Sequence, residues 1–291
     1  MNNPLVSILL PSYNHEKFIE EAILSIMNQT YKNIELIVID DGSSDNSPEI
    51  IEKLQKEYDF FYEKQSNQGL IKTLEKLLLK ANGEYISLFS SDDVYTDTKI
   101  EKLIEYLLKN KEYDLVYSKI KIIDQNSNCI KEVSENYKKG FIFNDLLCGN
   151  FFINGLGVLI KTDIYIKYKR KDSYIDDLQL WLQVAKDHNI GFVDEYLTYY
   201  RIHNNHLSSN LFKMQRSEFE ILSRYKNENI YFIALNNWNI RWFGSFARCD
   251  KMYAIKEFLP KIIKLGNLFN KKFYKSFFKL FVPCFVFKRK K

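Results

Sequence analysis

The sequence predicts an α/β fold, in which a mostly parallel β-sheet is flanked by helices and followed by a helical C-terminal extension. Over residues 1–125, short apolar runs alternate with segments of helical periodicity, which is typical of a parallel sheet covered by helices. Acidic pairs follow the second and fourth apolar runs. From Leu211 onward the pattern is helical, with few Gly or Pro. We therefore expect one domain over residues 1–210 and a helical extension over residues 211–291.

Strands and helices are expected to alternate along the first domain. The expected strands are residues 6–10, 35–39, 60–63, 85–89 and 115–118. Helices are expected after Asn14, Ser47 and Gly69, and over residues 100–108 and 177–187. Asn14 and Ser47 are predicted to cap their helices, with Pro48 at the first helical position, where the missing N–H costs nothing.

The composition indicates a globular protein of the reducing cytoplasm. With 291 residues, 46% of them hydrophobic, the chain can bury a full core. Cys129, Cys148, Cys249 and Cys284 show neither a disulfide framework nor metal-ligand spacing. The first residues run directly into a strand pattern without an export signal, so we expect a cytoplasmic location.

The C-terminal tail is both basic and aromatic. From residue 251 to 291 there are twelve Lys or Arg and one acidic residue, Glu257, so the tail carries +11 and the rest of the chain about −6. From residue 269 onward it carries Phe269, Phe273, Phe277, Phe278, Phe281, Phe285 and Phe287. This combination favours peripheral contact with the inner face of the cytoplasmic membrane over nucleic-acid binding. The alternative is a helix that packs its aromatic residues on the body.

Two acidic pairs lie where strands of the predicted sheet end. Asp40 and Asp41 follow one strand, and Asp92 and Asp93 follow another. Ligands of open parallel sheets bind beyond the carboxyl ends of the strands. Mg²⁺ and Mn²⁺ take oxygen ligands, usually one or two carboxylates plus substrate phosphates. These pairs therefore predict a divalent-cation and phosphate site; the alternatives are turn formation for the first pair and a helix N-terminus for the second. The second pair is the stronger functional candidate.

Five motifs in order resemble one known family. They are residues 6–14 (VSILLPSYN), 25–29 (SIMNQ), 39–44 (IDDGSS), 67–69 (NQG) and 91–93 (SDD). Together they resemble the family 2 glycosyltransferases of the GT-A fold, over residues 4–125. The resemblance implies an inverting enzyme that uses a UDP-sugar and Mn²⁺ or Mg²⁺.

The resemblance also implies roles for residues of the donor half. Pro11 and Tyr13 match the segment that contacts the donor nucleotide, with Tyr13 stacked on uracil. Asp41 matches the acid that hydrogen-bonds the base, and Lys72 matches a basic residue near the nucleotide. Asp92 is expected near the ribose and the metal ion, and Asp93 as a direct metal ligand.

Three downstream residues resemble the family's remaining machinery. Asp177 follows Asp176 at a helix start and matches the catalytic base that deprotonates the acceptor hydroxyl; a simple helix-terminal acid is the alternative. Arg201 and His203 match a segment that closes over the diphosphate, with His203 as a metal ligand, and His206 lies nearby. A structural, hydrogen-bonded histidine is the alternative. Residues 154–157 are expected to help select the sugar.

The complete prediction is transfer of one hexose, glucose or galactose, from a UDP-sugar to a hydroxyl of a glycan acceptor. The tail suggests a lipid-linked acceptor, such as one on undecaprenyl diphosphate, in bacterial surface-polysaccharide synthesis. The segment 238–242 resembles the QxxRW motif of processive synthases but lacks its Gln, so packing is the expected role. The alternative function is a non-catalytic nucleotide-sugar or carbohydrate binding protein on the same scaffold.

Overall fold

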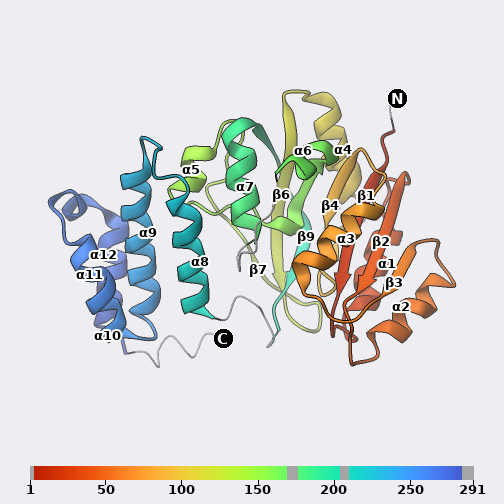
Figure 1. Ribbon diagram of the computed structural model, residues 1–291, viewed down its shortest axis with the longest axis horizontal. Helices are drawn as coiled ribbons and strands as arrows, with labels where there is room; N and C mark the ends of the chain where they lie inside the picture. Colours follow the sequence, from red (N-terminus) through yellow and green to blue (C-terminus); the bar gives the residue numbers. More distant parts are fainter. Residues whose placement is uncertain (1–2, 169–175, 204–209, 284–291) are drawn as a thin grey trace. The chain divides into compact units, whose positions relative to one another are not determined.

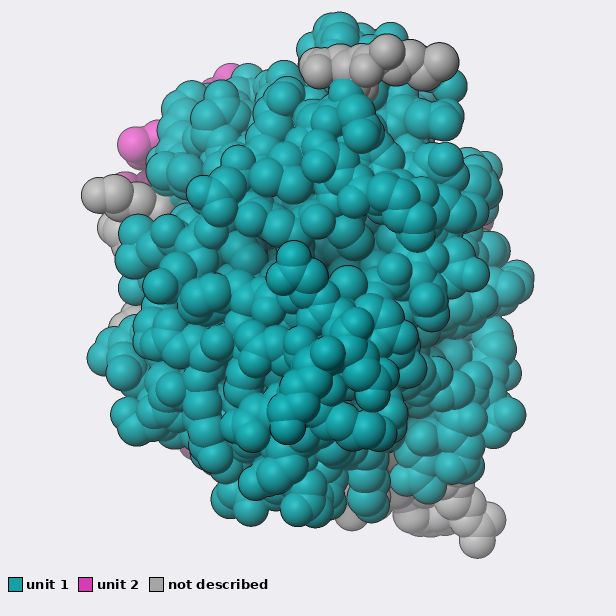
Figure 2. Space-filling model, turned by 90° about the vertical axis from the view of Figure 1, so that its right-hand side faces the viewer, with its two compact units in different colours: residues 1–142, 151–209 teal, residues 143–150, 210–291 magenta. Residues whose placement is uncertain are grey.

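The computed structural model describes residues 3–168, 176–203 and 210–283 (Figure 1). The chain forms two compact units, which Figure 2 colours separately: unit 1 holds residues 1–142 and 151–209, and unit 2 holds residues 143–150 and 210–291. The main part of unit 2 begins at Asn210, one residue before the expected start of the helical extension. Residues 143–150, which the sequence placed in the first domain, also belong to unit 2. His206 and the tail residues Phe285 and Phe287 lie outside the described residues.

Unit 1 contains a mixed sheet with the strand order β3-β2-β1-β4-β8-β6-β9-β5, and β7 pairs with β6. The strands are β1 (Val6–Ser12), β2 (Ile34–Asp40), β3 (Phe61–Lys64), β4 (Tyr85–Leu88), β5 (Val94–Tyr95), β6 (Tyr113–Ile123), β7 (Cys129–Glu132), β8 (Val158–Lys161) and β9 (Asn189–Arg201). The pairs β3–β2, β2–β1, β1–β4 and β6–β9 are parallel, whereas β8, β5 and β7 run antiparallel to their neighbours. The predicted mostly parallel sheet flanked by helices is confirmed.

Helices cover the sheet on both faces, which explains the continuous apolar runs of the strands. Val6, Ile8 and Leu10 of β1 share a core with α1 (Ile19–Met27), α2 (Ser47–Gln55) and α4 (Lys99–Lys109). Helix α3 (Leu70–Lys80) contacts β1 and β2 but contributes none of its buried residues to that core, so it lies on the other face (Figure 1).

Both predicted helix caps are wrong. Helix α1 begins at Ile19, while Asn14 adopts a positive φ of 53° and its amide oxygen accepts the N–H of Ser44 at 2.8 Å. Helix α2 begins at Ser47 itself, whose hydroxyl accepts the N–H of His15 at 3.0 Å. Both side chains therefore connect the segment after β1 to the segment after β2. They do not cap their helices because these long-range hydrogen bonds replace the local capping bonds.

The rest of unit 1 returns the chain to the sheet. A short 3₁₀ turn, η1 (Gly155–Gly157), leads into β8, and α6 (Thr162–Lys167) follows. Helix α7 (Asp176–Asp187) packs against the unit through buried residues such as Leu180 and Trp181, as predicted. Strand β9 then carries the chain back to the carboxyl edge of the sheet, where β6 pairs with it.

Unit 2 is helical throughout its described residues. It consists of α5 (Phe143–Leu147), α8 (Leu211–Ser223), α9 (Tyr231–Phe246), α10 (Lys251–Tyr253), η3 (Ala254–Phe258), α11 (Leu259–Ile262), η4 (Leu265–Phe269), α12 (Lys271–Phe277) and η5 (Phe278–Leu280). The buried indole of Trp238 donates to the Leu147 carbonyl at 2.8 Å, which ties α5 to α9. Arg241 stacks between Trp238 and Trp242. The aromatic pair of residues 238–242 thus packs within the unit.

Within residues 3–168, 176–203 and 210–283, no helix has the length and apolar character needed to cross a bilayer.

Candidate active site

Three loops meet at the carboxyl edge of the sheet because β1 lies between β2 and β4. The loop after β1 is hydrogen-bonded to the loop after β2 through the Asn14 N–H and the Ser43 hydroxyl, at 2.9 Å. It is bonded to the loop after β4 through His15 Nδ1 and the Ser91 hydroxyl, at 2.7 Å. The pairs Asp40–Asp41 and Asp92–Asp93 therefore flank the short segment that follows β1.

The two acids of the first pair have different partners. Asp40 is fully buried and accepts the N–H of Ser43 at 2.8 Å, which makes it the residue that closes the turn. Asp41 accepts the backbone N–H groups of Gln68 at 2.8 Å and Gly69 at 2.9 Å. The Asp41 carboxylate therefore orders the loop before α3, at the place where the sequence predicted contact with the donor base.

Gly42 allows this turn to approach the neighbouring loop. Its φ is +77°, and a Cβ there would lie 2.8 Å from the backbone nitrogen of Asn67. A side chain would therefore separate the two loops. Of the other predicted donor residues, Tyr13 exposes 48% of its surface, Pro11 is half-buried in β1, and Lys72 is exposed on α3.

Asp92, from the second pair, faces two histidines. One carboxylate oxygen lies 2.9 Å from Nε2 of His203, and the hydroxyl of Ser90 donates to the other. Burial alone would raise the pKa of Asp92, but attraction from His15 and the bonds from Ser90 and His203 outweigh it and lower the pKa. Burial lowers the pKa of His15 more than Asp92 raises it, so the neutral imidazole is favoured.

Asp93 points to a different environment. It is 1% exposed and accepts the backbone N–H of Arg201 at 2.7 Å. Burial and the nearby charge of Asp92 raise its pKa well above the ordinary value. Lys99 lies fully buried close by, and burial lowers the pKa of its ammonium group while Asp93 opposes that shift.

One group among the described residues has ligand atoms close enough to hold a metal ion. The ligand atoms of His15, Asp92 and His203 all lie within 4.8 Å of one another. Nδ1 of His15 is hydrogen-bonded to the Ser91 hydroxyl, and when Nδ1–H is the donor Nε2 is the ligand atom, which is the usual arrangement for a metal-binding imidazole. Two imidazoles and one carboxylate suit Mn²⁺ better than Mg²⁺, which prefers oxygen ligands. The residues therefore fit a divalent cation.

The sequence predicted two of these three residues. Asp92 and His203 were expected at a metal site, and the structure brings them together, whereas Asp93 is outside the group. His15 was missed, although it directly follows Asn14 at the carboxyl end of β1. That position was the available signal, because every loop at this edge can contribute to a ligand site.

Asp177 lies against the turn η1. A Cβ built on Gly155 would overlap the carboxylate of Asp177, so this side chain rests directly on the glycine backbone. The turn lies at the start of β8 and contacts β4, β6 and β9. Asp177 is therefore associated with the same edge of the sheet as the two acidic pairs. The side chain of Asp176 lies outside the described residues.

Comparison with known proteins identifies the family of this chain. Residues 7–168, more than half of the chain, match the family described as glycosyl transferase family 2. The chain belongs to glycosyl transferase family 2. This glycosyltransferase is 31% identical over 251 residues to an uncharacterized glycosyltransferase of Methanocaldococcus jannaschii, covering 80% of this chain and 85% of that protein.

A second relative has an assigned reaction. It is the Escherichia coli protein WfgD, named UDP-Glc:alpha-D-GlcNAc-diphosphoundecaprenol beta-1,3-glucosyltransferase, which is 32% identical over 240 residues, covering 77% of this chain and 88% of WfgD.

Solved structures share the fold at lower identity. TarS of S. aureus in complex with UDP-GlcNAc has a TM-score of 0.61 and 17% identity, covering 98% of this chain and 92% of that one. A mannosyltransferase of Pyrobaculum calidifontis, in complex with GDP-Man and Mn²⁺, has a TM-score of 0.60 and 14% identity, covering 96% and 86% of the two chains. These similarities support the GT-A fold.

Arg201, which the sequence suggested as a diphosphate contact in this glycosyltransferase, lies inside the protein. Its side chain is fully buried, and its guanidinium donates to the backbone carbonyls of Asp92 at 2.7 Å and Asp124 at 3.0 Å. It also pairs with Glu21 at 2.6 Å. Arg201 therefore supports the acidic turn from inside the protein, because its donors are used by neighbouring protein groups.

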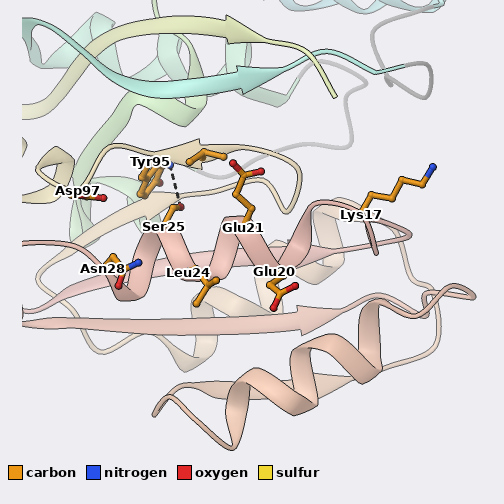
Figure 3. Close-up of a pocket in the computed structure, with 9 residues that line it drawn as sticks. Lys17, Glu20, Glu21, Leu24, Ser25, Asn28, Tyr95 and Asp97 are labelled. Carbon is orange, nitrogen blue, oxygen red and sulfur yellow. Dashed lines mark hydrogen bonds between the residues drawn. The ribbon is translucent and has the colours of Figure 1, made fainter. Parts of the chain in front are cut away.

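A hollow lies beside α1 and β5 (Figure 3). Its lining includes Glu20, Glu21, Ser25 and Asp97, and the Ser25 hydroxyl accepts the N–H of Tyr95 at 3.2 Å. Figure 3 shows Glu20 and Glu21 on α1 with their carboxylates pointing in different directions. The hollow contains neither Asp92 nor His203, so its location does not coincide with the candidate site.

Proposed function

We propose that this glycosyltransferase is an inverting hexosyltransferase that moves one hexose from a UDP-sugar to a hydroxyl of a lipid-linked glycan. The observation that carries the proposal is the group formed by His15, Asp92 and His203, which lies beside the loop ordered by Asp41. A nucleotide diphosphate sugar requires both features. Its phosphates need a cation to neutralise their charge, and its base needs a specific hydrogen-bond partner.

The donor nucleotide binds along the loops after β1 and β2. Tyr13, with 48% of its surface exposed, stacks on the base. Asp41 hydrogen-bonds the base with the acceptor capacity that remains beside the backbone N–H groups of Gln68 and Gly69 and the side-chain amide of Gln65. Pro11 shapes the same loop, and the exposed Lys72 lies on the helix that follows the Asp41-ordered segment.

A divalent cation, in our proposal Mn²⁺, is held by His15, Asp92 and His203. When bound, the cation neutralises charge that develops on the leaving diphosphate. Asp93 adds negative charge behind this group while one of its oxygens accepts the Arg201 N–H. Direct ligation by Asp93 remains a prediction from the family resemblance, and metal titration of an Asp93→Asn variant tests it.

Asp177 is the catalytic base. Its carboxylate takes the proton of the acceptor hydroxyl as the hydroxyl oxygen bonds to the anomeric carbon. The bond between that carbon and the diphosphate oxygen breaks in the same displacement, and its electron pair leaves with UDP. A single displacement inverts the anomeric configuration. The 32% identity to WfgD supports glucose as the sugar and an undecaprenyl-diphosphate-linked glycan as the acceptor.

An Asp177→Asn variant tests the proposal. We expect kcat for transfer to fall about 10²- to 10⁴-fold, the usual contribution of a general base, with UDP affinity retained. Asp187→Asn is the matched control, because Asp187 is an exposed acid at the other end of the same helix. UDP release is measured with UDP-glucose and an undecaprenyl-type GlcNAc-diphosphate acceptor. Donor binding by the wild-type enzyme without turnover of any UDP-sugar would favour the non-catalytic alternative.

Unit 2 carries the surface that we propose for contact with the membrane. Four large apolar side chains are exposed at one end of it: Phe232 (78%), Ile233 (60%), Ile263 (64%) and Phe269 (93%). Reciprocal amide bonds between Asn236 and Asn267, at 2.8 and 2.9 Å, hold the start of α9 against η4 and so bring these residues to the same region.

Exposed lysines lie near this apolar surface in sequence, namely Lys264, Lys271 and Lys272. An interface that combines exposed aromatic residues with lysines suits an anionic bilayer, where each basic residue near the surface contributes about 1 kcal/mol. The surface would place the enzyme beside a lipid-linked acceptor, at the inner face of the cytoplasmic membrane.

Vesicle co-sedimentation tests this contact. We expect binding to vesicles of phosphatidylglycerol and phosphatidylcholine, and loss of binding in the double variant Phe269→Ser, Ile263→Ser. Leu79→Ser is the control, because Leu79 is 84% exposed on α3 of unit 1. Equal sedimentation of the double variant and the wild type would contradict the assigned surface, and transfer to a soluble acceptor should be the same for all three proteins.

A further inference from the structure

Lys99, the first residue of α4, is a buried lysine that none of the proposed roles uses. It is fully buried, and its ammonium group donates to the backbone carbonyl of Leu156. The same group lies 3.2 Å from the ring centroid of Tyr95 and is attracted by Asp93. Removing an ammonium group from water costs several kcal/mol unless it is paired. Its position therefore needs an explanation beyond the packing of α4.

The carbonyl that Lys99 contacts belongs to a turn constrained on several sides. The Asn154 side chain accepts the Leu156 N–H at 3.0 Å, and the Asn154 carbonyl accepts the Gly157 N–H at 3.0 Å. A Cβ on Gly157 would lie 3.1 Å from the Ser118 carbonyl of β6. The Lys99 bond adds an anchor from the side of the acidic turn, so the backbone of residues 154–157 has little freedom to move.

Gly155 is the point at which this turn meets Asp177. A Cβ would overlap the carboxylate carbon and oxygens of Asp177, so the absence of a side chain allows the close approach. The turn itself therefore forms the surface on which the carboxylate rests. Any shift of the turn would therefore change the position that the Asp177 carboxylate can occupy.

We propose that Lys99 and Gly155 are positioning residues: Lys99 anchors the turn 154–157 through the Leu156 carbonyl, and Gly155 lets that turn set the location of the Asp177 carboxylate. The inference rests on the proposed function, because it takes Asp177 as the base. It connects the two halves of the site, since Lys99 contacts the turn beneath Asp177 and is attracted by Asp93 of the acidic turn. No sequence motif marked either residue for positioning, although Gly155 lies in the segment 154–157 that was expected to help select the sugar.

Gly155→Ala provides the main test. The added methyl group displaces the Asp177 carboxylate, and a misplacement of about 1 Å can lower kcat about 10²-fold. Because the proposed nucleotide contacts lie in other loops, the Kd of UDP from calorimetry should stay within about twofold of the wild type. Gly266→Ala is the control, since a Cβ there meets nothing within 4 Å. Normal kcat in Gly155→Ala, or an altered UDP Kd with normal kcat, would overturn the proposal.

A double variant separates a positioning role from a general loss of structure. If Gly155 acts through Asp177, adding Gly155→Ala to Asp177→Asn lowers the residual rate no further. A further loss equal to that of Gly155→Ala alone would refute the coupling. An unchanged kcat in Asp177→Asn itself contradicts the proposed base, whereas an inactive Asp177→Asn beside a fully active Gly155→Ala contradicts only the positioning role.

Lys99→Met tests the anchor at the other end. It keeps a long unbranched side chain but removes the bond to Leu156. At saturating Mn²⁺ we expect kcat to fall about tenfold or more, with KM for the donor unchanged. A rise in donor KM without a fall in kcat would refute the anchoring role. If Lys99→Met does not fold, the Gly155→Ala series alone decides the proposal.

Discussion

Replacing Arg201 by Met should destabilise unit 1 because this residue supports the acidic turn from inside. The guanidinium is fully buried and lies 4.9 Å from the ring centroid of Phe18. It donates to the carbonyls of Asp92 and Asp124 and pairs with Glu21. Met fills much of the same volume without any donor, so the variant isolates the loss of these bonds.

The size of the effect follows from the partners left behind. A buried carbonyl that loses its donor costs about 1–3 kcal/mol, which applies in full to Asp92 and at the lower end to the half-buried Asp124. The Glu21 side chain is 44% exposed, so its ion pair adds at most about 1 kcal/mol. The sum is about 4 kcal/mol, within the range of about 3–5 kcal/mol for breaking a buried charged interaction.

Urea unfolding measures this loss. With a slope of about 2 kcal/mol per molar urea, a loss of about 4 kcal/mol lowers the midpoint for unit 1 by about 2 M. Lys109→Ala is the control, because Lys109 forms an exposed ion pair with Glu105, and pairs of that kind contribute about 0.3–0.5 kcal/mol. An Arg201→Met midpoint as close to the wild type as that of the control would refute the reasoning.

Three further predictions concern donor binding, metal binding and pH. Asp41→Asn should raise the Kd of UDP in calorimetry by about tenfold, since an amide repels one of the two N–H groups that now order the loop; an unchanged Kd would contradict this. His15→Ala should weaken Mn²⁺ binding about 10- to 100-fold in a metal titration, whereas His188→Ala should not. Burial lowers the pKa of Lys279 to about 8 from 10.5, so the unfolded chain holds this proton to higher pH than the folded one. The stability of unit 2 should therefore rise between about pH 8 and 10.5, and Lys279→Gln should remove that part of the rise.

The sequence by itself determined the element order and the placement of the acidic pairs. Local periodicity and turn residues are short-range properties, so the strands ending at Asp40 and Leu88 could be located within a few residues. The parallel sheet then required both pairs to lie at one edge. Asp92 and His203 could be predicted as neighbours because the family resemblance assigned each of them to the metal site.

Tertiary structure decided which side chains those acids meet. Asn14 and Ser47 have capping chemistry, but their hydrogen bonds go to other loops, and no local pattern encodes that choice. His15 became a metal-ligand candidate only when β1 was placed between β2 and β4. Lys99 and Gly155 carry no motif, because a buried lysine and a close-packed glycine are defined by contacts between segments far apart in sequence. Long-range packing, which periodicity does not record, therefore decided how the site is assembled.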